Sequence, residues 1–588
     1  MWSLRRSLIL LASLLSLLPL ASCGGPAAQD YGTPPPSPPA VHSHTPCQGH
    51  TSNPISLNMY YGSEKQAWIE DVTKTFNASH YVACDGPITI HATPIGSGDS
   101  MEEILSGAIK PDIWSPAGSV WLTLANDAWR QKNNGKDLVG SGATDALSVV
   151  SSPVVIAMWK PLAEALGWPN KQIGWSDIAN LAGKSDGWGA YGKGEYGAFK
   201  FGHTHPDTSN SGLDAVLAEY YAAAGKSRDL SAEDVSKSQT RDFIGKIESA
   251  VTHYGESTGF FANEMFNRGP DYLSAAVMYE SLVAASYDPA QYPDAKKYPP
   301  VVAIYPKEGT FLSDHPFVIP QASWVSVSKR AAAEIFADYL LDKPQQVKAL
   351  KYGFRPATPQ AVPLAAPLDG AHGVDPNQPS NLLQVPGAQL IRQIKAGWDE
   401  QRRKVSVMIV LDRSGSMNDA VNNKSKIDAA KDGLKSFIGL LSDTDQVGLT
   451  VFSDNAQVLS PIDPLSGRRD QLLKTVDGVK ADGKTRLYDT VAEQVDALKK
   501  NNDSTIKAVI VLTDGLDTSS QRNVDDVVNQ VNGSGSNSGN GLKVFAIAYG
   551  DDADKDGLTR IAHASGGEEY DGSPDNIRRV FLAISRFF

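Results

Sequence analysis

This sequence has no excess of positive charge. Its 588 residues contain 54 Lys and Arg against 66 Asp and Glu, which gives a net charge of −12 at pH 7. Because no phosphate-neutralising field is available, this balance argues against nucleic acid or an anionic lipid surface as the main partner. We also find no HExxH motif, nucleophile elbow or Ser/His/Asp order worth crediting as a catalytic signal. We therefore expect a binding protein rather than an enzyme.

Long apolar runs are lacking everywhere except at the N-terminus. Arg5 and Arg6 precede an apolar run from Leu8 to Leu20, which is the order typical of a secretory signal. No later stretch approaches the roughly 18 apolar residues that a membrane-spanning helix needs. The run ends in LASC at residues 20–23, which resembles the bacterial lipobox. That resemblance implies a signal peptide at 1–22 and a lipid on Cys23, with an ordinary cleaved signal as the alternative.

Cysteine is scarce. Besides Cys23, the chain contains only Cys47 and Cys84. The signal implies an oxidising compartment, in which these two thiols are candidates for a disulfide. Such a bond would fix the end of the N-terminal segment to the first domain. Two free buried thiols are the alternative, because the sequence does not give the distance between the two residues.

The length of the chain exceeds what one hydrophobic core supports, so we expect more than one domain. Residues 23–53 are rich in Pro and Ser and are interpreted as an extended tether. A second Pro-rich stretch near 355–381 separates two segments of different pattern. The predicted organisation is a first domain at 54–356, a linker with a connecting helix at 357–402, which docks on one domain or couples the two, and a second domain at 403–588.

Both predicted domains alternate strands and helices, so the fold class is α/β. In the first domain, short apolar segments such as ISLNMYY and VVIAMW alternate with helical ones such as GLDAVLAEYYAAAG. In the second, KVSVMIVL, DQVGLTVFS, IKAVIVLT and GLKVFAIAYG are near-continuous aliphatic runs, as buried parallel strands require. Amphipathic helices separate these runs, which predicts a doubly wound sheet.

The first strand of the second domain leads into a loop rich in oxygen ligands. Asp412, Ser414 and Ser416 form a D-x-S-x-S pattern at the carboxyl end of a predicted parallel strand, where open α/β sheets bind ligands. Oxygen-only ligands select a hard cation, here Mg²⁺ or else Mn²⁺ or Ca²⁺. A short loop of Asp, Ser and Gly is also an ordinary turn or helix cap.

The D-x-S-x-S pattern resembles the metal-ion-dependent adhesion site of von Willebrand factor A domains. Thr485 in DGKTRLYDT and Asp514 in VIVLTDGLDT stand where that family supplies two further ligands, and the three elements follow the family order. The resemblance implies a divalent metal that an acidic residue of a protein partner completes. A weaker metal candidate nearby is an EF-hand-like run, Asp552, Asp554 and Asp556, which we interpret as helix capping since His563 stands where Glu is needed.

The first domain resembles bacterial extracellular solute-binding proteins of the two-lobed type II periplasmic-binding fold. Small hydroxyl residues and glycines stand at predicted helix N-termini, where free N–H groups hold polar or anionic ligands. A family-like AVMYES segment adds Tyr279 or Glu280. Simple helix capping is the alternative at each turn, and the ligand itself is not readable. The predicted solute-binding residues are Ser63, Ser97, Ser100, Ser209, Ser211 and Tyr279.

The combined expectation is a lipoprotein on the outer face of the bacterial cell membrane. It would pair a solute-binding-like domain with a metal-dependent protein-binding domain, in adhesion, assembly or sensing. One alternative is a solute receptor for an ABC transporter, with the second domain as a docking module. The other is a metal-dependent hydrolase, which would need a base beside the metal. His203 and His205 in the predicted Ser-rich loop are as readily explained as loop imidazoles.

Overall fold

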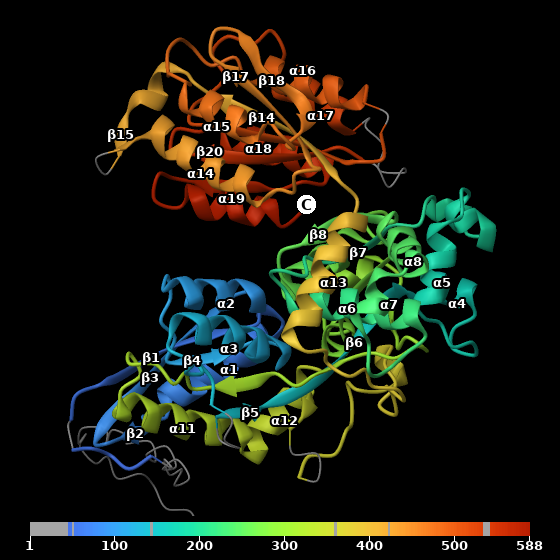
Figure 1. Ribbon diagram of the computed structural model, residues 1–588, viewed down its shortest axis with the longest axis vertical. Helices are drawn as coiled ribbons and strands as arrows, with labels where there is room; N and C mark the ends of the chain where they lie inside the picture. Colours follow the sequence, from blue (N-terminus) through green and yellow to red (C-terminus); the bar gives the residue numbers. More distant parts are fainter. Residues whose placement is uncertain are drawn as a thin grey trace, which may run out of the picture. The chain divides into compact units, whose positions relative to one another are not determined.

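The computed structural model describes residues 45–49, 52–140, 145–357, 361–421, 424–501, 503–532 and 541–588. The predicted signal peptide, Cys23 and most of the predicted tether lie outside these residues. Within them, no helix combines the length and apolar character that crossing a membrane requires. Two α/β lobes and a third α/β unit follow one another along the chain (Figure 1), which confirms the predicted class.

The first lobe is built on a six-stranded sheet of order β2-β3-β1-β4-β12-β5. β1 pairs in parallel with β3 and β4, whereas β12 is antiparallel to β4 and β5. The late strand β12 returns to this lobe after the second lobe has formed. The strands are β1 (Ile55–Tyr61), β2 (Val82–Ala83), β3 (Gly86–Pro94), β4 (Ile113–Ser115), β5 (Ala146–Ser148) and β12 (Pro316–Val318); the helices are α1 (Gln66–Ala78), α2 (Ser97–Ser106), α3 (Val120–Lys132), α11 (Val327–Leu341) and α12 (Lys343–Lys351).

The second lobe is built on a sheet of order β10-β6-β9-β7-β8, with two short strands added to β6. The chain crosses between lobes at β5 and β6, and returns at β11 and β12. The strands are β6 (Val150–Trp159), β7 (Phe201–Thr204), β8 (Val251–Gly255), β9 (Ala275–Tyr279), β10 (Val301–Ile304), β11 (Leu312–Ser313) and β13 (Arg355–Pro356); the helices are α4 (Lys160–Leu166), α5 (Trp175–Ala182), α6 (Asn210–Ala224), α7 (Ala232–Ser236), α8 (Ser238–Glu248), α9 (Thr258–Arg268) and α10 (Glu280–Ala285).

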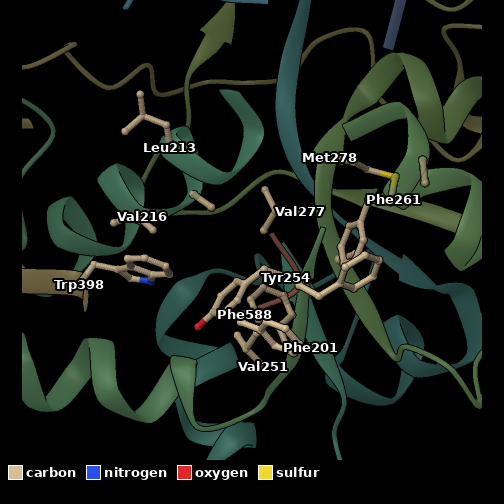
Figure 2. Packing of buried hydrophobic residues seen from close by; sticks show 14 of the residues in the cluster. Phe201, Leu213, Val216, Val251, Tyr254, Phe261, Val277, Met278, Trp398 and Phe588 are labelled. Atoms are coloured by element: carbon tan, nitrogen blue, oxygen red, sulfur yellow. The ribbon is translucent and has the colours of Figure 1, made fainter. Parts of the chain in front are cut away.

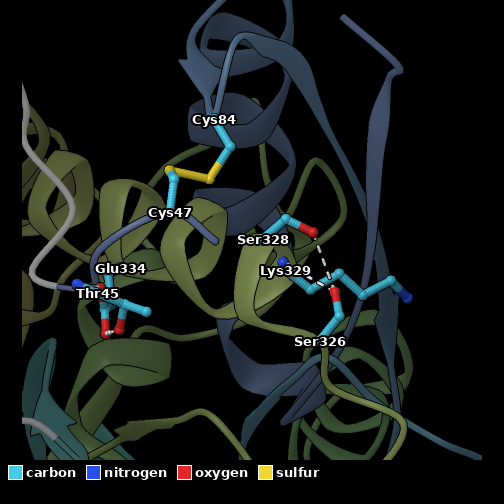
Figure 3. The surroundings of a disulfide bond; sticks show 7 residues. All are labelled: Thr45, Cys47, Cys84, Ser326, Ser328, Lys329 and Glu334. Carbon is cyan, nitrogen blue, oxygen red and sulfur yellow. Dashed lines mark hydrogen bonds between the residues drawn. A yellow bond between two sulfur atoms is a disulfide. The ribbon is translucent and has the colours of Figure 1, made fainter. Parts of the chain in front are cut away.

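A disulfide fixes the described N-terminal residues to the first lobe. Cys47 and Cys84 are bonded, with their Cα atoms 5.5 Å apart (Figure 3). Close by, the backbone N–H of Thr45 donates to Glu334 Oε2 of α11 at 2.7 Å. Of the two readings that the sequence left open, the structure contains the disulfide, and it places the bond where the predicted tether meets the first domain.

The predicted connecting helix is α13 (Ala388–Gln401), and it docks on the second lobe, where it contacts α6, α7 and α8. Its apolar face carries Ile391, Ile394 and Trp398, all buried. The 3.6-residue period of these positions places them on one side of the helix. α13 therefore reaches β14 of the C-terminal unit from a fixed position on the second lobe.

The C-terminal unit is a doubly wound sheet of order β18-β17-β14-β19-β20-β21. All its pairings are parallel except that of the edge strand β18. Figure 1 shows α14 and α19 on the opposite face of the sheet from α16 and α17. The strands are β14 (Val405–Asp412), β17 (Gln446–Phe452), β18 (Ala456–Pro464), β19 (Ile506–Thr513), β20 (Lys543–Tyr549) and β21 (Glu569–Gly572); the helices are α14 (Lys426–Leu440), α15 (Arg469–Asp477), α16 (Leu487–Lys499), α17 (Val524–Asn532), α18 (Lys555–Ser565) and α19 (Ile577–Ser585), and β15 (Ala420–Val421) and β16 (Lys424–Ser425) form a small hairpin.

The aliphatic strand β14 is buried on both faces. Val407 and Ile409 belong to the core that contains α14, whereas Met408 and Val410 belong to the core that contains α16. Alternate residues of a strand point to opposite faces, so a strand between two helical layers is apolar at every position. This packing fixes Asp412, the last residue of β14, at the edge of the sheet.

Candidate functional site

The predicted metal ligands come from neighbouring parallel strands. β14 ends at Asp412, and β19 beside it ends at Thr513, directly before Asp514. Since the two strands are parallel and in register, their carboxyl ends meet at one edge of the sheet. The two carboxylates therefore lie close together there, and both residues are buried.

Hydrogen bonds hold the Asp412 carboxylate in place. The backbone N–H of Ser414 donates to Oδ1 at 2.7 Å, and the Thr513 hydroxyl donates to Oδ2 at 2.6 Å. Burial raises the pKa of Asp412 to about 6 against these bonds, and the nearby charge of Asp514 acts in the same direction. A buried carboxylate beside a second one favours a cation as its neighbour.

The two predicted serines link this loop to Asp514. The Ser416 hydroxyl donates to Asp514 Oδ1 at 2.8 Å, and the hydroxyls of Ser414 and Ser416 are 3.1 Å apart. The predicted residues of the first loop and the second acid thus form one hydrogen-bonded group. Four of the five predicted ligands are brought together by direct contacts.

Thr485 reaches the same edge from the loop before α16. The backbone N–H of Gly415 donates to Gly483 O at 2.9 Å, which ties this loop to the Asp412 loop. Two hydrogen bonds to Thr518 hold the backbone of Thr485: the N–H of Thr518 donates to its carbonyl at 2.9 Å, and its own N–H donates to the Thr518 hydroxyl at 3.0 Å. A Cβ built on Gly515 would lie 3.9 Å from Thr485 Oγ1, so the hydroxyl lies against the loop that carries Asp514.

Lys426 lies at the same edge, which was not predicted from the sequence. Its Nζ lies 2.8 Å from Asp514 Oδ2, and the lysine side chain is only 12% exposed. Lys426 is the first residue of α14. A lysine at the start of a helix is usually exposed to solvent, so its position in the sequence did not indicate a contact with Asp514. A tethered cation therefore balances one of the two buried carboxylates.

The donor set fits a hard divalent cation. Two carboxylates and three hydroxyls offer oxygen atoms only, from Asp412, Ser414, Ser416, Thr485 and Asp514, which is the chemistry that Mg²⁺ selects. The EF-hand-like run behaves differently. Asp554 caps α18 by accepting from the N–H of Gly557 at 3.1 Å, in agreement with the capping interpretation.

A pocket of about 580 Å³ lies between the two lobes of the first domain. Ser63 and Gly96 border it from the first lobe, and Ser257 and Gly259 border it from the second. The Ser63 hydroxyl accepts from the N–H of Gly259 at 3.2 Å, so the start of α9 faces the opposite lobe. Aromatic residues add apolar surface to this interlobe pocket; they are Trp68, Phe260, Tyr292, Tyr352 and Phe354.

Two residues that border the interlobe pocket carry buried polar atoms for which the described residues supply no hydrogen-bond partner. These atoms are Trp68 Nε1 and Ser281 Oγ. A buried donor without a partner costs about 1–3 kcal/mol. Both atoms are closed off from solvent in this conformation, so they belong to the packing behind the pocket.

The other predicted solute-binding residues are buried and bonded within the protein. Ser100 accepts from Trp114 Nε1 at 2.8 Å, and Ser97 accepts from the N–H of Ala117 at 3.0 Å. The hydroxyls of Ser209 and Ser211 lie 3.1 and 2.8 Å from that of Thr258. Among the six predicted residues, only Ser63 borders the interlobe pocket.

Tyr279 and Glu280 also serve the fold around the cleft. Tyr279 OH accepts from Asn210 Nδ2 at 3.1 Å, and the Glu280 carboxylate accepts from Nε and Nη2 of Arg355, each at 2.7 Å. Behind the pocket, Lys65 Nζ lies 2.8 Å from Glu64 Oε1, and both side chains are buried. This pairing with Lys65 lowers the pKa of Glu64 to about 2 despite its burial, which acts in the opposite direction.

Two family models match the chain. The one described as bacterial extracellular solute-binding protein matches residues 57–355, and the one described as von Willebrand factor type A domain matches residues 407–516. No curated protein matches the chain.

Solved structures give matches to both parts. A von Willebrand factor type A protein from Catenulispora acidiphila is 25% identical over 31% of this chain, with a TM-score of 0.27, and the match spans only 42% of that protein. The periplasmic thiamin binding protein is 12% identical over 60% of this chain and 98% of its own, with a TM-score of 0.43. AfuA from Actinobacillus pleuropneumoniae, with exogenous fructose-6-phosphate bound, is 15% identical over 60% of this chain and 99% of its own, with a TM-score of 0.40.

Proposed function

The chain belongs to the family of bacterial extracellular solute-binding proteins and carries a von Willebrand factor type A domain behind the solute-binding domain, and on this premise we propose a two-site binding protein. Its C-terminal domain binds a protein partner through a divalent metal. Its two-lobed domain binds a polar solute. Lipid on Cys23 holds the protein at the outer face of the cell membrane.

One observation carries the proposal for the C-terminal domain. Oxygen atoms from three separate loops converge at the edge where β14 and β19 end, and both carboxylates there are buried. Asp412, Ser414, Ser416, Thr485 and Asp514 would hold Mg²⁺. When bound, the cation supplies an electrophilic centre for a carboxylate of the partner.

The chain's own residues prepare this edge for an acidic partner. Ser414 N–H and Thr513 Oγ1 fix Asp412, and Ser416 fixes Asp514, so the oxygen ligands are oriented beforehand. Next to Lys426 lies a pocket of about 440 Å³, bordered by Lys555 and also by Asp551, Asp552 and Asp571. Lys555 pairs with Asp571 and Lys426 with Asp514, so the preference for an acidic partner residue rests on the bound cation and not on this pocket.

A pull-down tests this proposal with a matched pair of variants. Immobilised full-length protein is exposed to a cell-envelope extract in Mg²⁺ or in EDTA. Captured partners should be lost in EDTA and in Asp412→Ala, and kept in Asp419→Ala, which removes an exposed acid from the same loop. Capture that persists in excess EDTA rejects metal-mediated binding.

The lining of the interlobe pocket supports an uncharged polar solute with an apolar face. The charged residues that border the pocket are all acidic: Glu64, Glu70 and Glu256. Lys65 pairs with Glu64 and Arg586 with Glu256, so these neighbouring cations are not available to an oxyanion. Aromatic side chains border the same pocket, among them Phe260, Tyr292 and Tyr352. Such a lining favours a sugar-like or heterocyclic solute over an oxyanion.

A thermal-shift panel of sugars, amino acids and oxyanions tests the solute proposal. A binder should raise the melting temperature of the wild type and have less effect on Phe260→Ala, which removes an aromatic side chain from the pocket border. Stabilisation by oxyanions alone would contradict the argument from charge. For the lipid, Cys23→Ser should release the protein from membranes into the soluble fraction, whereas retention would reject the anchor.

A further inference from the structure

A second group of metal-binding side chains lies inside the second lobe, far along the sequence from the adhesion-type site. His203 of β7, Glu219 of α6 and Glu248 of α8 each offer one ligand atom, and these atoms lie within 4.8 Å of one another. All three side chains are fully buried. The sequence had suggested that His203 belongs to a loop, but it lies on a core strand.

The hydrogen bonds of His203 define its tautomer. Its Nδ1 lies 2.8 Å from the carbonyl oxygen of Thr204, and a carbonyl only accepts, so Nδ1 carries the proton. In the neutral ring, Nε2 is then a lone pair, and it faces Glu248 Oε1 at 3.1 Å. Two acceptors that face each other need a proton or a metal ion between them. The N–H to carbonyl bond is the one that orients histidine ligands in metal sites.

Glu219 points independently to a cation at this place. Neither of its carboxylate oxygens has a hydrogen-bond partner among the described residues, although the side chain is fully buried. A buried carboxyl group without any partner costs several kcal/mol by transfer estimates.

Glu248, by contrast, is firmly held as a carboxylate. Trp398 Nε1 donates to Oε1 at 2.9 Å, and Tyr254 OH donates to Oε2 at 2.7 Å. Figure 2 shows Trp398 and Tyr254 in this packed core, and their ring centroids are 5.3 Å apart. Because these donors stabilise its charge, Glu248 acts as an acceptor toward His203 Nε2 and does not donate a proton to it.

We propose that His203, Glu219 and Glu248 form a structural site for a divalent transition-metal ion such as Zn²⁺ or Mn²⁺. One neutral imidazole and two carboxylates balance a charge of +2 and suit these ions. Ligands at 2.0–2.2 Å from one tetrahedral ion lie about 3.4 Å apart, so small side-chain rotations close the group around it. The ion links α6, β7 and α8, and through Trp398 it stabilises the docking of α13.

This site differs in kind from the adhesion-type edge. All three ligand residues are fully buried, so the site offers no face to a protein partner. For the same reason we expect the ion to be taken up during folding and to resist brief EDTA treatment. An Mg²⁺ ion at the adhesion-type edge should instead be removed by brief EDTA treatment.

The test uses full-length protein in an Asp412→Ala/Asp514→Ala background, so that bound metal reports on the buried site alone. The protein is refolded with Zn²⁺, with Mn²⁺ or without metal, desalted, and analysed by inductively coupled plasma mass spectrometry. One equivalent should remain bound and raise the melting temperature. Glu219→Gln should lose both effects, whereas Glu233→Gln, an exposed residue on α7 of the same lobe, should keep them.

A measurement without a ligand variant guards against a Glu219→Gln protein that fails to fold. Refolding the same background protein with Co²⁺ should give the visible absorption bands of a protein-bound ion. The proposal would be overturned if the Co²⁺ protein showed no such bands and the protein retained neither Zn²⁺ nor Mn²⁺. So would a Glu219→Gln protein that is as stable as its parent and equally insensitive to metal, because Glu219 would then be a buried neutral acid.

Discussion

Removal of the Lys426 ammonium is the most informative perturbation of the adhesion-type edge. In Lys426→Met, Asp514 loses a cation at 2.8 Å while its own side chain is fully buried. Breaking a buried ion pair costs about 3–5 kcal/mol. Since Lys426 keeps 12% of its surface exposed, we expect about 3 kcal/mol of destabilisation in EDTA.

The same substitution should increase the affinity for Mg²⁺. In Lys426→Met the ammonium is gone, so it neither competes with a cation held by Asp412 and Asp514 nor repels it. At an effective dielectric constant near 20, two charges about 4 Å apart interact by roughly 4 kcal/mol. If a third of this is recovered, Mg²⁺ binds about tenfold more tightly, and the stability deficit seen in EDTA largely disappears.

Isothermal titration with Mg²⁺ and thermal unfolding in Mg²⁺ or EDTA measure both effects on the full chain. Lys424→Met is the control, because Lys424 is 44% exposed and pairs with Asp432 instead. Weaker Mg²⁺ binding by Lys426→Met than by wild type would refute the reasoning. Lys426 would then orient Asp514 for the metal rather than compete with it.

Three further predictions concern the disulfide, a buried carboxyl group and one predicted metal ligand. Cys47→Ser opens a bond that spans 37 residues, and the chain-entropy relation predicts a loss of about 4 kcal/mol, measurable by urea unfolding and mimicked in wild type by a reductant. Burial raises the pKa of Asp214 to about 7, so between about pH 4 and 7 the folded state keeps a proton that the unfolded state has lost. Stability should therefore fall as pH rises through this window, by at most about 1.4 kcal/mol per pH unit, and a Tm–pH profile of Asp214→Asn should lack that component; an unchanged profile contradicts it. Thr485→Ala should weaken Mg²⁺ binding about tenfold in titration yet leave Tm in EDTA unchanged, since backbone bonds to Thr518 hold the loop.

Local pattern was sufficient where one side chain or one strand decides the outcome. The aliphatic runs form β14, β17, β19 and β20, which are buried on both faces. A strand buried on both faces needs apolar side chains along its length, so the local sequence is enough to identify it. The spacing of Asp412, Ser414 and Ser416 likewise puts their oxygens on one loop. Capping by Asp554 follows from the same local chemistry.

Only the tertiary structure decided which distant side chains meet. Whether Ser100 or Ser209 faces a solute or a buried neighbour depends on how the two lobes pack. The local sequence of a turn does not contain that information. Lys426 reaches Asp514 across 88 residues of sequence, and His203 lies beside Glu219 and Glu248 because three elements cross there. The sequence determines the chemistry of a side chain and the face of its own helix or strand on which it lies. Which residues that side chain contacts is decided by tertiary packing, because elements far apart in the chain come together only when the lobes fold.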